Sequence, residues 1–336
     1  MHFMSDFLSE LRERATEGGQ ERILFVESAP EVIEAARRLK EAGLAQPIMV
    51  HAKDADTSSM NALGLTLVSI DDARADELKA MLVRNHAGKI SEAEATVLCH
   101  DPLVYGMYLL KIGEADGLVA GKERTTSDVI RSGLRVVGKD EGINTVSSAF
   151  YMVVPPFRGG KTEEVLTFAD CGIVVHPTAP QLADIAIAAA DARIFIVGDE
   201  PRVALLSYST KGSGGDSASI QSVREALAIV KTRRPDIRIE GEMQADAALI
   251  ATISERKIKG ESGIGHGSAN VLVFPNLDAG NIAYKLVERL VPGAKAIGPI
   301  GQGFSQPIND LSRGASVEDI VDSALVAALH AKRKRV

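Results

Sequence analysis

The sequence predicts an α/β protein made of two domains, each with a mainly parallel sheet flanked by helices. The chain has 336 residues, which suits two domains when a domain takes roughly 150 residues. Short apolar runs typical of strands alternate with runs of helical periodicity from near the start. Around residue 145 this alternation gives way to strands separated by turns, which indicates a second domain.

The first domain is predicted to open on a strand at Arg22-Ile-Leu-Phe-Val26. The helix that follows has Pro30 in its first turn and ends at Gly43. Its apolar positions recur at helical spacing, at Val32, Ile33, Ala36 and Leu39. Further strands are predicted at residues 47–50, 67–70 and 117–120, with helices between them.

The second domain begins with three strand candidates, at residues 148–154, 165–168 and 172–175. Turn-rich segments separate them, which favours an antiparallel or mixed part of a sheet. Alternation then resumes, with strands predicted at 203–207, 238–240 and 271–274 and helices at 220–230, 245–254 and 279–291.

The last strand and helix follow the second domain directly, and we expect them to return to the first. The final helix has one apolar face, formed by Val317, Ile320, Val321, Ala324 and Leu325. The predicted domains are therefore residues 1–145 with 295–336, and residues 146–294. This return would bring the segment 299–319 to a cleft between the domains, where ligand sites tend to form.

Composition excludes several classes of protein. A net charge of -7 argues against nucleic acid as a partner, because backbone phosphates require a clustered cationic surface. The longest apolar runs are shorter than a membrane span, and the first residues lack the features of a signal peptide, so we expect no membrane partner and a cytoplasmic location. Cys99 and Cys171 are too far apart to suggest a disulfide framework or a zinc site, and Cys171 is interpreted as a small buried apolar residue. No metal site is predicted.

The segment Pro299-Ile-Gly-Gln-Gly-Phe304, continued by Pro307-Ile-Asn-Asp-Leu-Ser-Arg-Gly314, is rich in groups that bind anions. An arginine fork and glycine backbone amides are suited to phosphate, and a fixed hydroxyl or guanidinium is suited to a tetrahedral oxyanion. We predict a site in one loop, made of Gly301, Gly303, Asn309, Ser312 and Arg313.

Asp319 has two interpretations. Ser316-Val-Glu-Asp319 has the pattern of a capping box, with Ser316 as the N-cap and Asp319 as the third helical residue. A position near a helix N-terminus favours the ionised carboxylate, which makes a weak base toward a thiol. The alternative is a catalytic base, and one residue can serve both purposes.

Two other segments are candidates for anion binding. In Gly121-Lys-Glu-Arg-Thr-Thr-Ser-Asp128, Thr125 or Thr126 can cap a helix, and Arg131 lies one to two turns into it. The segment Leu206-Ser-Tyr-Ser-Thr-Lys-Gly-Ser-Gly-Gly215 lies between a strand and a helix, as phosphate-binding loops do. It matches neither a Walker A motif nor a dinucleotide fingerprint, and a structural turn is the alternative. Glu242 and Asp246 are interpreted as capping or packing residues, since no third ligand completes a metal site nearby.

Taken together, these motifs resemble the phosphate acetyltransferase and phosphate butyryltransferase family, whose members pass an acyl group between phosphate and the thiol of coenzyme A. The resemblance also includes Phe168-Ala-Asp-Cys171, Gly241-Glu-Met-Gln-Ala-Asp246 and Val273-Phe-Pro-Asn-Leu-Asp-Ala-Gly280. It implies an isocitrate/isopropylmalate dehydrogenase-like fold and a homodimer. It also implies that coenzyme A is a substrate and that there is no separate cofactor.

The same resemblance implies roles for individual residues. Ser312, Arg313 and Arg131 would be active-site residues, and Asp319 would be the base for the thiol. Arg84 aligns loosely with a second arginine of the site. Contacts to coenzyme A or phosphate would come from Thr126, Ser207, Lys211, Gly212 and Ser213.

We therefore expect reversible transfer of an acetyl group between coenzyme A and phosphate, by direct attack of a thiolate in a ternary complex. Butyryl transfer is the first alternative, because pocket volume alone separates the two acyl groups. A metal-dependent decarboxylating dehydrogenase and a non-catalytic acyl-CoA-binding protein are more distant alternatives.

Overall fold

The computed structural model describes residues 6–333, in two compact units. The first unit contains Glu10–Glu141 together with residues 304–333, and the second contains Gly142–Gly303 together with residues 6–9. The interpretation of residues 1–5 lies outside the described part of the chain. We describe each unit by itself.

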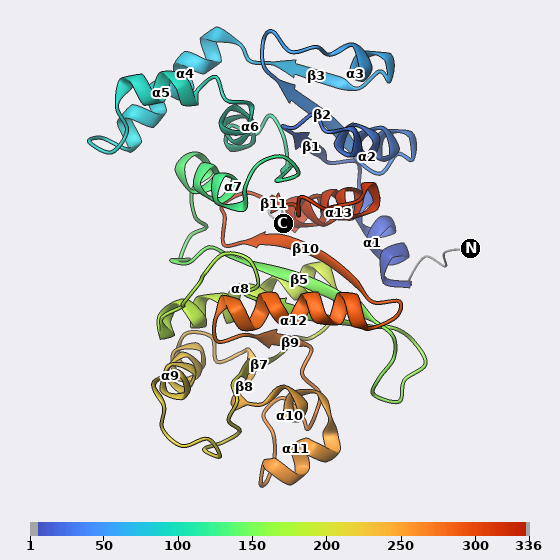
Figure 1. Cartoon of the computed structure of the whole chain (residues 1–336), viewed down its shortest axis with the longest axis vertical. Helices are drawn as coiled ribbons and strands as arrows, with labels where there is room; N and C mark the ends of the chain where they lie inside the picture. Colours follow the sequence, from blue (N-terminus) through green and yellow to red (C-terminus); the bar gives the residue numbers. More distant parts are fainter. Residues whose placement is uncertain (1–5, 334–336) are drawn as a thin grey trace. The chain divides into compact units, whose positions relative to one another are not determined.

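The first unit is built on a parallel sheet (Figure 1). Its strands follow the order β3-β2-β1-β4-β11. They are β1 (Arg22–Phe25), β2 (Gln46–His51), β3 (Thr66–Ser69), β4 (Gly117–Ala120) and β11 (Ile308–Asp310). The four strands predicted before residue 145 are confirmed to within one residue at each end.

Helices cover both faces of this sheet. They are α2 (Pro30–Glu41), α3 (Ser58–Ala62), α4 (Asp72–Asn85), α5 (Glu92–Leu98), α6 (Pro102–Lys111), α7 (Thr126–Ser132), which continues into a π-helical turn (Gly133–Val137), and α13 (Val317–Arg333). A Cβ at Gly117 would meet Ala327 of α13, whereas a Cβ at Gly106 of α6 would meet Leu118. Since Gly117 and Leu118 are consecutive in β4, their side chains point to opposite faces, and α13 and α6 lie on opposite sides of the sheet.

The second unit has a mixed sheet. Its strands follow the order β10-β5-β6-β9-β7-β8, where the first three are antiparallel and the last four are parallel. They are β5 (Ser147–Val154), β6 (Glu164–Ala169), β7 (Arg202–Leu206), β8 (Arg238–Met243), β9 (Val271–Val273) and β10 (Lys295–Gln302). The predicted antiparallel portion is therefore present at β5 and β6.

The helices of the second unit pack on this sheet and on one another. They are α8 (Ala179–Ile196), α9 (Ala218–Arg233), α10 (Ala245–Leu249), α11 (Ala251–Lys257) and α12 (Leu277–Leu290), while α1 (Asp6–Thr16) spans the boundary between the units. Phe150, Met152 and Val154 point from one face of β5 into a core that includes Tyr284 of α12. The rings of Phe150 and Tyr284 stack, with centroids 3.9 Å apart.

The structure corrects three details of the predicted fold. Residues 172–175 form no strand, because the amides of Ile173 and Val174 donate to the Asp170 carboxylate. The helix predicted at 245–254 is divided at Ile250, which has extended backbone angles (φ -120°, ψ 115°). Residues 295–303, which the sequence assigned to the first domain, lie in the second unit because β10 pairs with β5.

Two further predictions concern the state of Cys171 and the hydropathy of the helices. Cys171 is fully buried and unpaired, as expected of a small apolar residue, and burial raises the pKa of its thiol well above the ordinary value. Among the described residues, no helix is long and apolar enough to span a membrane.

Gly106 of α6 provides a test of the packing of the first unit. A Cβ at this position would lie 2.5 Å from Cγ1 of Val26 and 3.3 Å from Cδ1 of Leu118. We expect Gly106→Val to lower the free energy of unfolding by about 1 to 3 kcal/mol, because the added methyl groups overpack a close contact. Urea denaturation followed by circular dichroism measures this loss. Ala80→Val at an exposed position of α4 is the control, and an equal effect of both substitutions would contradict the close packing of α6.

Candidate functional site

The segment 299–319 is divided between two strands, a turn and the start of α13, so the prediction of one loop is wrong. Gly301 is buried within β10 and pairs with Ser148. Asn309 is fully buried in β11, where its side-chain amide donates to the backbone oxygen of Ser323 at 2.8 Å. These two residues therefore make structural contacts and are not presented to a ligand.

Gly303 also has a structural reason for its identity. Its φ is +81°, and a Cβ would come within 2.9 Å of Cγ2 of Ile143. The left-handed backbone and the close approach both require glycine at this position.

Ser312 and Arg313 lie in an exposed turn that follows β11. The turn is closed by a hydrogen bond from the amide of Ala315 to the backbone oxygen of Ser312, at 2.9 Å. The Ser312 hydroxyl accepts a bond from the amide of Gly314 at 3.2 Å. The guanidinium of Arg313 makes no ion pair or hydrogen bond with any residue that the structure describes. The turn thus presents a hydroxyl and a free guanidinium at adjacent positions.

Asp319 forms the predicted capping box at the start of α13. Its Oδ2 accepts bonds from the backbone amide and the hydroxyl of Ser316, at 2.9 and 2.8 Å, and its own amide donates to the Ser316 hydroxyl at 3.3 Å. The other carboxylate oxygen, Oδ1, accepts no bond within the described part of the chain. The cap therefore uses one oxygen of Asp319 and leaves the other available.

Two consecutive threonines at the start of α7, Thr125 and Thr126, make different contacts. Thr125 is the N-cap, and its hydroxyl accepts from the amide of Asp128 at 3.2 Å. The hydroxyl of Thr126 donates to Oδ2 of Asp310 at 2.6 Å. The start of α7 is thereby bonded to the end of β11, two residues before Ser312.

The two arginines of the predicted site are exposed. Within residues 6–333, the guanidinium of Arg131 has polar contacts only in its own helix, where it lies 3.8 Å from the Asp128 carboxylate and 3.3 Å from the Ser127 hydroxyl. Arg84 lies at the end of α4, and its side chain has no polar partner among residues 6–333. No hydrogen bond or ion pair joins either guanidinium to the turn of Ser312 and Arg313 in the described part of the chain.

Glu27, which belongs to none of the predicted motifs, organises the loop after β4. Its buried carboxylate accepts hydrogen bonds from four consecutive backbone amides, those of residues 121–124, at 2.8 to 3.1 Å. Successive amides that converge in this way form an anion site, which here is filled by a side chain of the protein itself. Gly121 is required because a Cβ would lie 2.2 Å from Oδ1 of Asp310.

Asp310 is a second buried carboxyl group in this region. Burial raises its pKa to about 6, and the charge of Glu27 acts in the same direction, against hydrogen bonds from Thr126 and the amide of Leu311. Its Oδ1 is buried without a hydrogen-bond partner. Asp310 therefore carries a proton more readily than an ordinary aspartate.

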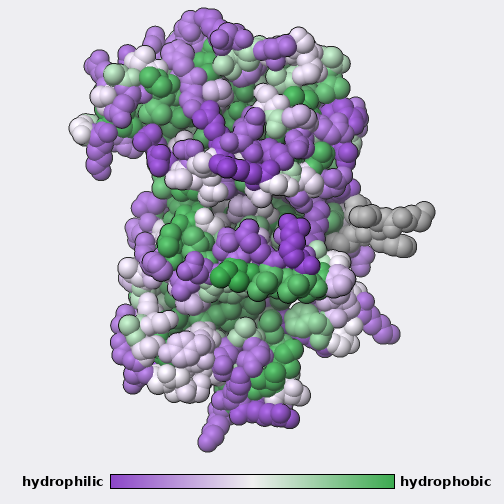
Figure 2. Space-filling view, viewed as in Figure 1, coloured by the Kyte–Doolittle hydropathy of each residue, from purple (hydrophilic) through white to green (hydrophobic). Residues whose placement is uncertain are grey.

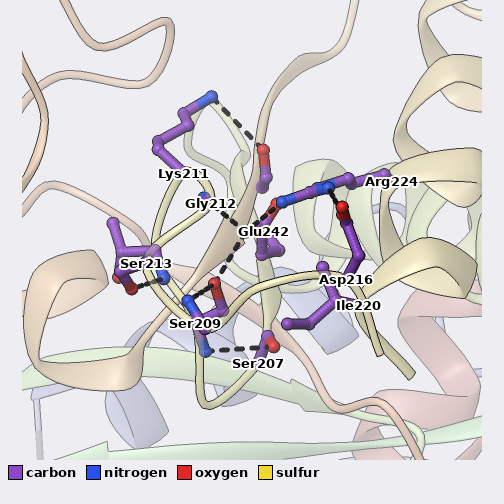
Figure 3. Close-up of polar contacts among 12 residues, drawn as sticks. Ser207, Ser209, Lys211, Gly212, Ser213, Asp216, Ile220, Arg224 and Glu242 are labelled. Carbon is purple, nitrogen blue, oxygen red and sulfur yellow. Dashed lines mark hydrogen bonds and ion pairs between the residues drawn. The ribbon is translucent and has the colours of Figure 1, made fainter. Parts of the chain in front are cut away.

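The loop after β7 in the second unit also surrounds a carboxylate of the chain (Figure 3). Buried Glu242 accepts bonds from the hydroxyl of Ser209 and the amide of Gly212, both at 2.8 Å. Arg224 of α9 donates to both of its oxygens, at 2.8 and 3.2 Å. Burial raises the pKa of Glu242, but these hydrogen bonds outweigh it and bring the pKa to about 2.

The predicted binding residues of this loop are partly committed to structural contacts. The ammonium of Lys211 pairs with Glu240 and also donates to the backbone oxygen of Gly241 at 3.2 Å. The hydroxyls of Ser207 and Ser213 accept bonds from amides within the loop, at 3.2 and 2.9 Å. Lys211 and Ser213 nevertheless remain exposed. The structural interpretation of Glu242 is confirmed, and Asp246 likewise pairs with Lys257 at 2.7 Å.

The sequence contains a weak indication of the carboxylates that organise these loops. Glu27 and Gly121 each follow a predicted strand, and parallel neighbouring strands bring such residues to one edge of the sheet. An acidic residue placed next to a glycine-containing loop in this way can be expected to bind its amides. Within residues 6–333, no group of three or more His, Cys, Asp or Glu side chains is placed to hold a metal ion.

Comparisons with known proteins agree with these motifs. The family model described as phosphate acetyl/butaryl transferase matches residues 6–328. A phosphate acetyltransferase of Treponema pallidum is 42% identical over 95% of this chain and 97% of its own length. A phosphate acetyltransferase of Acetivibrio thermocellus is 39% identical over 97% of this chain and 98% of its own length. The crystal structure of a phosphotransacetylase from Streptococcus pyogenes superimposes with a TM-score of 0.87, at 36% identity, over 98% of this chain and all of that one.

Asp310 predicts a pH dependence of stability. A folded-state pKa of about 6 lies above the ordinary aspartate value near 3.9, so the folded protein binds the proton more tightly. The stabilisation that protonated Asp310 provides is complete below about pH 4 and is lost as the pH rises through about 6. The loss amounts to about 2 to 3 kcal/mol of unfolding free energy. We expect Asp310→Asn to remove it, so the variant gains stability relative to the native protein between pH 4 and 6.5. Urea midpoints across this range measure the difference, and a difference that does not change with pH would contradict the assignment.

Proposed function

The chain belongs to the phosphate acetyl/butaryl transferase family, and on this premise we propose that it is a phosphate acetyltransferase. The reaction is the reversible conversion of acetyl-CoA and phosphate to coenzyme A and acetyl phosphate. The observation that carries this proposal is the exposed turn of Ser312 and Arg313, whose guanidinium has no partner among the described residues. A free arginine beside a hydroxyl suits both a phosphate and the oxyanion of a tetrahedral intermediate.

In the direction that forms acetyl-CoA, the thiol of coenzyme A loses its proton to Asp319. The thiolate attacks the carbonyl carbon of acetyl phosphate and forms the new carbon–sulfur bond. Ser312 donates to the carbonyl oxygen as it gains negative charge. The bond from the carbonyl carbon to the phosphate oxygen then breaks, and Arg313 and Arg131 stabilise the departing phosphate. Arg84, exposed at the end of α4, is proposed as a further phosphate contact.

The geometry of Asp319 allows it to act both as a cap and as a base. Its Oδ2 accepts both bonds from Ser316, so the cap persists while Oδ1 receives the proton. A direct ternary-complex route is preferred to an acyl-enzyme. A serine nucleophile requires an adjacent base, and within residues 6–333 the Ser312 hydroxyl makes a single hydrogen bond, which it accepts from the amide of Gly314.

We propose that coenzyme A is bound in part by the loop after β7, through the exposed side chains of Lys211 and Ser213. Ser207 and Gly212 then shape the loop, since both bond within it or to Glu242. Thr126 has an indirect role in phosphate binding, because its hydroxyl binds Asp310, two residues before Ser312. Coenzyme A enters as a substrate, and the proposed mechanism requires no separate cofactor.

Acetyl is proposed as the acyl group in preference to butyryl. The two curated relatives compared above are named phosphate acetyltransferase, and the motifs match that branch more fully. The discrimination expected from pocket volume is modest, because one methylene is worth only about 1 to 3 kcal/mol.

We expect Arg313→Ala and Ser312→Ala to lower kcat/KM for phosphate by about 100-fold or more, because each removes a group that stabilises charge in the transition state. Asp319→Asn keeps the capping oxygen, so a comparable loss of rate would identify it as the base. Phosphate-dependent loss of the thioester, measured with acetyl-CoA and butyryl-CoA side by side, gives these rates. Arg256→Ala at an exposed position of α11 is the control. No turnover of either thioester by the native protein would refute the proposed function.

We also propose that the chain forms a homodimer through an apolar face of α12. Ile282, Leu286 and Leu290 are spaced four residues apart and are 57%, 51% and 71% exposed. This spacing places them on one stripe of the helix, and Figure 2 shows hydrophobic surface along α12. Exposed apolar stripes of this kind favour self-association, and a two-fold axis would let the same helix face its own copy.

For the homodimer we expect Leu286→Asp to give a particle of about 36 kDa by light scattering, half the mass of the native particle, because a charge would be buried against the partner. Lys285→Asp, at the adjacent exposed position outside the stripe, should leave the mass unchanged. A native mass near 35.7 kDa, or an equal effect of both variants, would refute this interface.

A further inference from the structure

Lys122 is the residue through which the loop after β4 holds the turn of Ser312 and Arg313. Its ammonium donates to the backbone oxygens of Arg313 and Ala315, at 3.1 and 2.9 Å. The same nitrogen lies 3.2 Å from the carboxylate of Glu31 in the first turn of α2. These two oxygens belong to Arg313 itself and to the residue two positions after it, so the backbone that leaves Arg313 is held at two points.

The ammonium of Lys122 is fully used by these contacts. An ammonium has three donors, and here it makes two hydrogen bonds to backbone oxygens and an ion pair with Glu31. The side chain is only 11% exposed, in contrast to that of Lys53, which is 71% exposed and pairs with Asp72. Lys122 is thus a partly buried connection between backbone segments, whereas Lys53 is a surface ion pair of small energetic value.

The backbone from which this side chain extends is itself fixed. The amide of Lys122 is one of the four that donate to Glu27, at 2.9 Å. Its neighbour Gly121 donates to both oxygens of the same carboxylate. The loop therefore fixes the position of the ammonium, and the ammonium holds the turn of Ser312 and Arg313.

We propose that Lys122 is a positioning residue for the transferase reaction, which sets the place of Arg313 by binding its own backbone oxygen and that of Ala315. The proposal rests on the function proposed above, in which Arg313 holds the phosphate. Lys122 itself does not touch the substrate, because its donors are used within the protein. A displacement of catalytic groups by about 1 Å can cost about 100-fold in rate, which is the scale on which such a residue matters.

The first test is Lys122→Met, which keeps the length of the side chain and removes the charge and the donors. We expect kcat/KM for phosphate to fall by about 10-fold to 100-fold, while the KM for acetyl-CoA, its co-substrate, changes by less than twofold. Lys53→Met is the matched control and should match the native enzyme. An unchanged kcat/KM for phosphate, or an equal rise in the KM for both substrates, would overturn the proposal.

The second test is a double-mutant cycle with Arg313→Ala. If Lys122 acts through Arg313, the double variant should be no slower than Arg313→Ala alone, because the group being positioned is already absent. Losses that multiply would show that Lys122 acts by another route and would refute the proposal.

A third measurement does not depend on activity. Amide hydrogen exchange across residues 311–316 should be faster in Lys122→Met than in the native protein, with other segments unchanged. Faster exchange in a protein without transferase activity would refute the proposed function but support the positioning of the turn. Unchanged exchange would refute the positioning role, whatever the activity.

Discussion

The bonds between the Glu27 carboxylate and the amides of residues 121–124 are the constraint on which the rest of the candidate site depends. They fix the loop after β4, and this loop carries Lys122 on one side and leads into α7 on the other. Lys122 then binds the turn of Arg313, and Thr126 binds Asp310 before that turn. One carboxylate thus determines the relation between two segments that lie almost 200 residues apart in the sequence.

Carboxylates also accept hydrogen bonds from loop amides in the second unit. Asp170 accepts bonds from the amides of residues 172–174, and Glu242 accepts bonds from Gly212 and Ser209. Backbone amides at the ends of strands need acceptors, and an ionised carboxylate is a strong one. The amides of these loops therefore bind carboxylates of the protein itself and are not available to a ligand. The guanidinium of Arg313 has no partner within the described chain, and for this reason it is a candidate to bind a ligand.

Much of the fold followed from local pattern. The strand predicted at residue 22, the helix that begins at Pro30 and the capping box of Ser316 and Asp319 all depend on neighbouring residues, and the structure contains each of them. Residues 172–175 misled the prediction, because an apolar run is equally compatible with a loop whose amides bind Asp170. Asn309 was misplaced for a related reason. Its type suits a binding loop, but only the pairing of β11 with β4 shows that it is buried.

The sequence by itself determined the α/β architecture, the capping of the last helix and the set of residue types able to bind phosphate, since these depend on composition and on spacings of a few residues. The tertiary structure decided which of those residues are exposed, which strand residues 295–302 join, and which carboxylates fill the loops. The physical reason is that burial and hydrogen-bond partners come from strands that are distant in the sequence. Glu27, Lys122 and Asp310 acquire their roles only when β1, β4 and β11 lie side by side in one sheet.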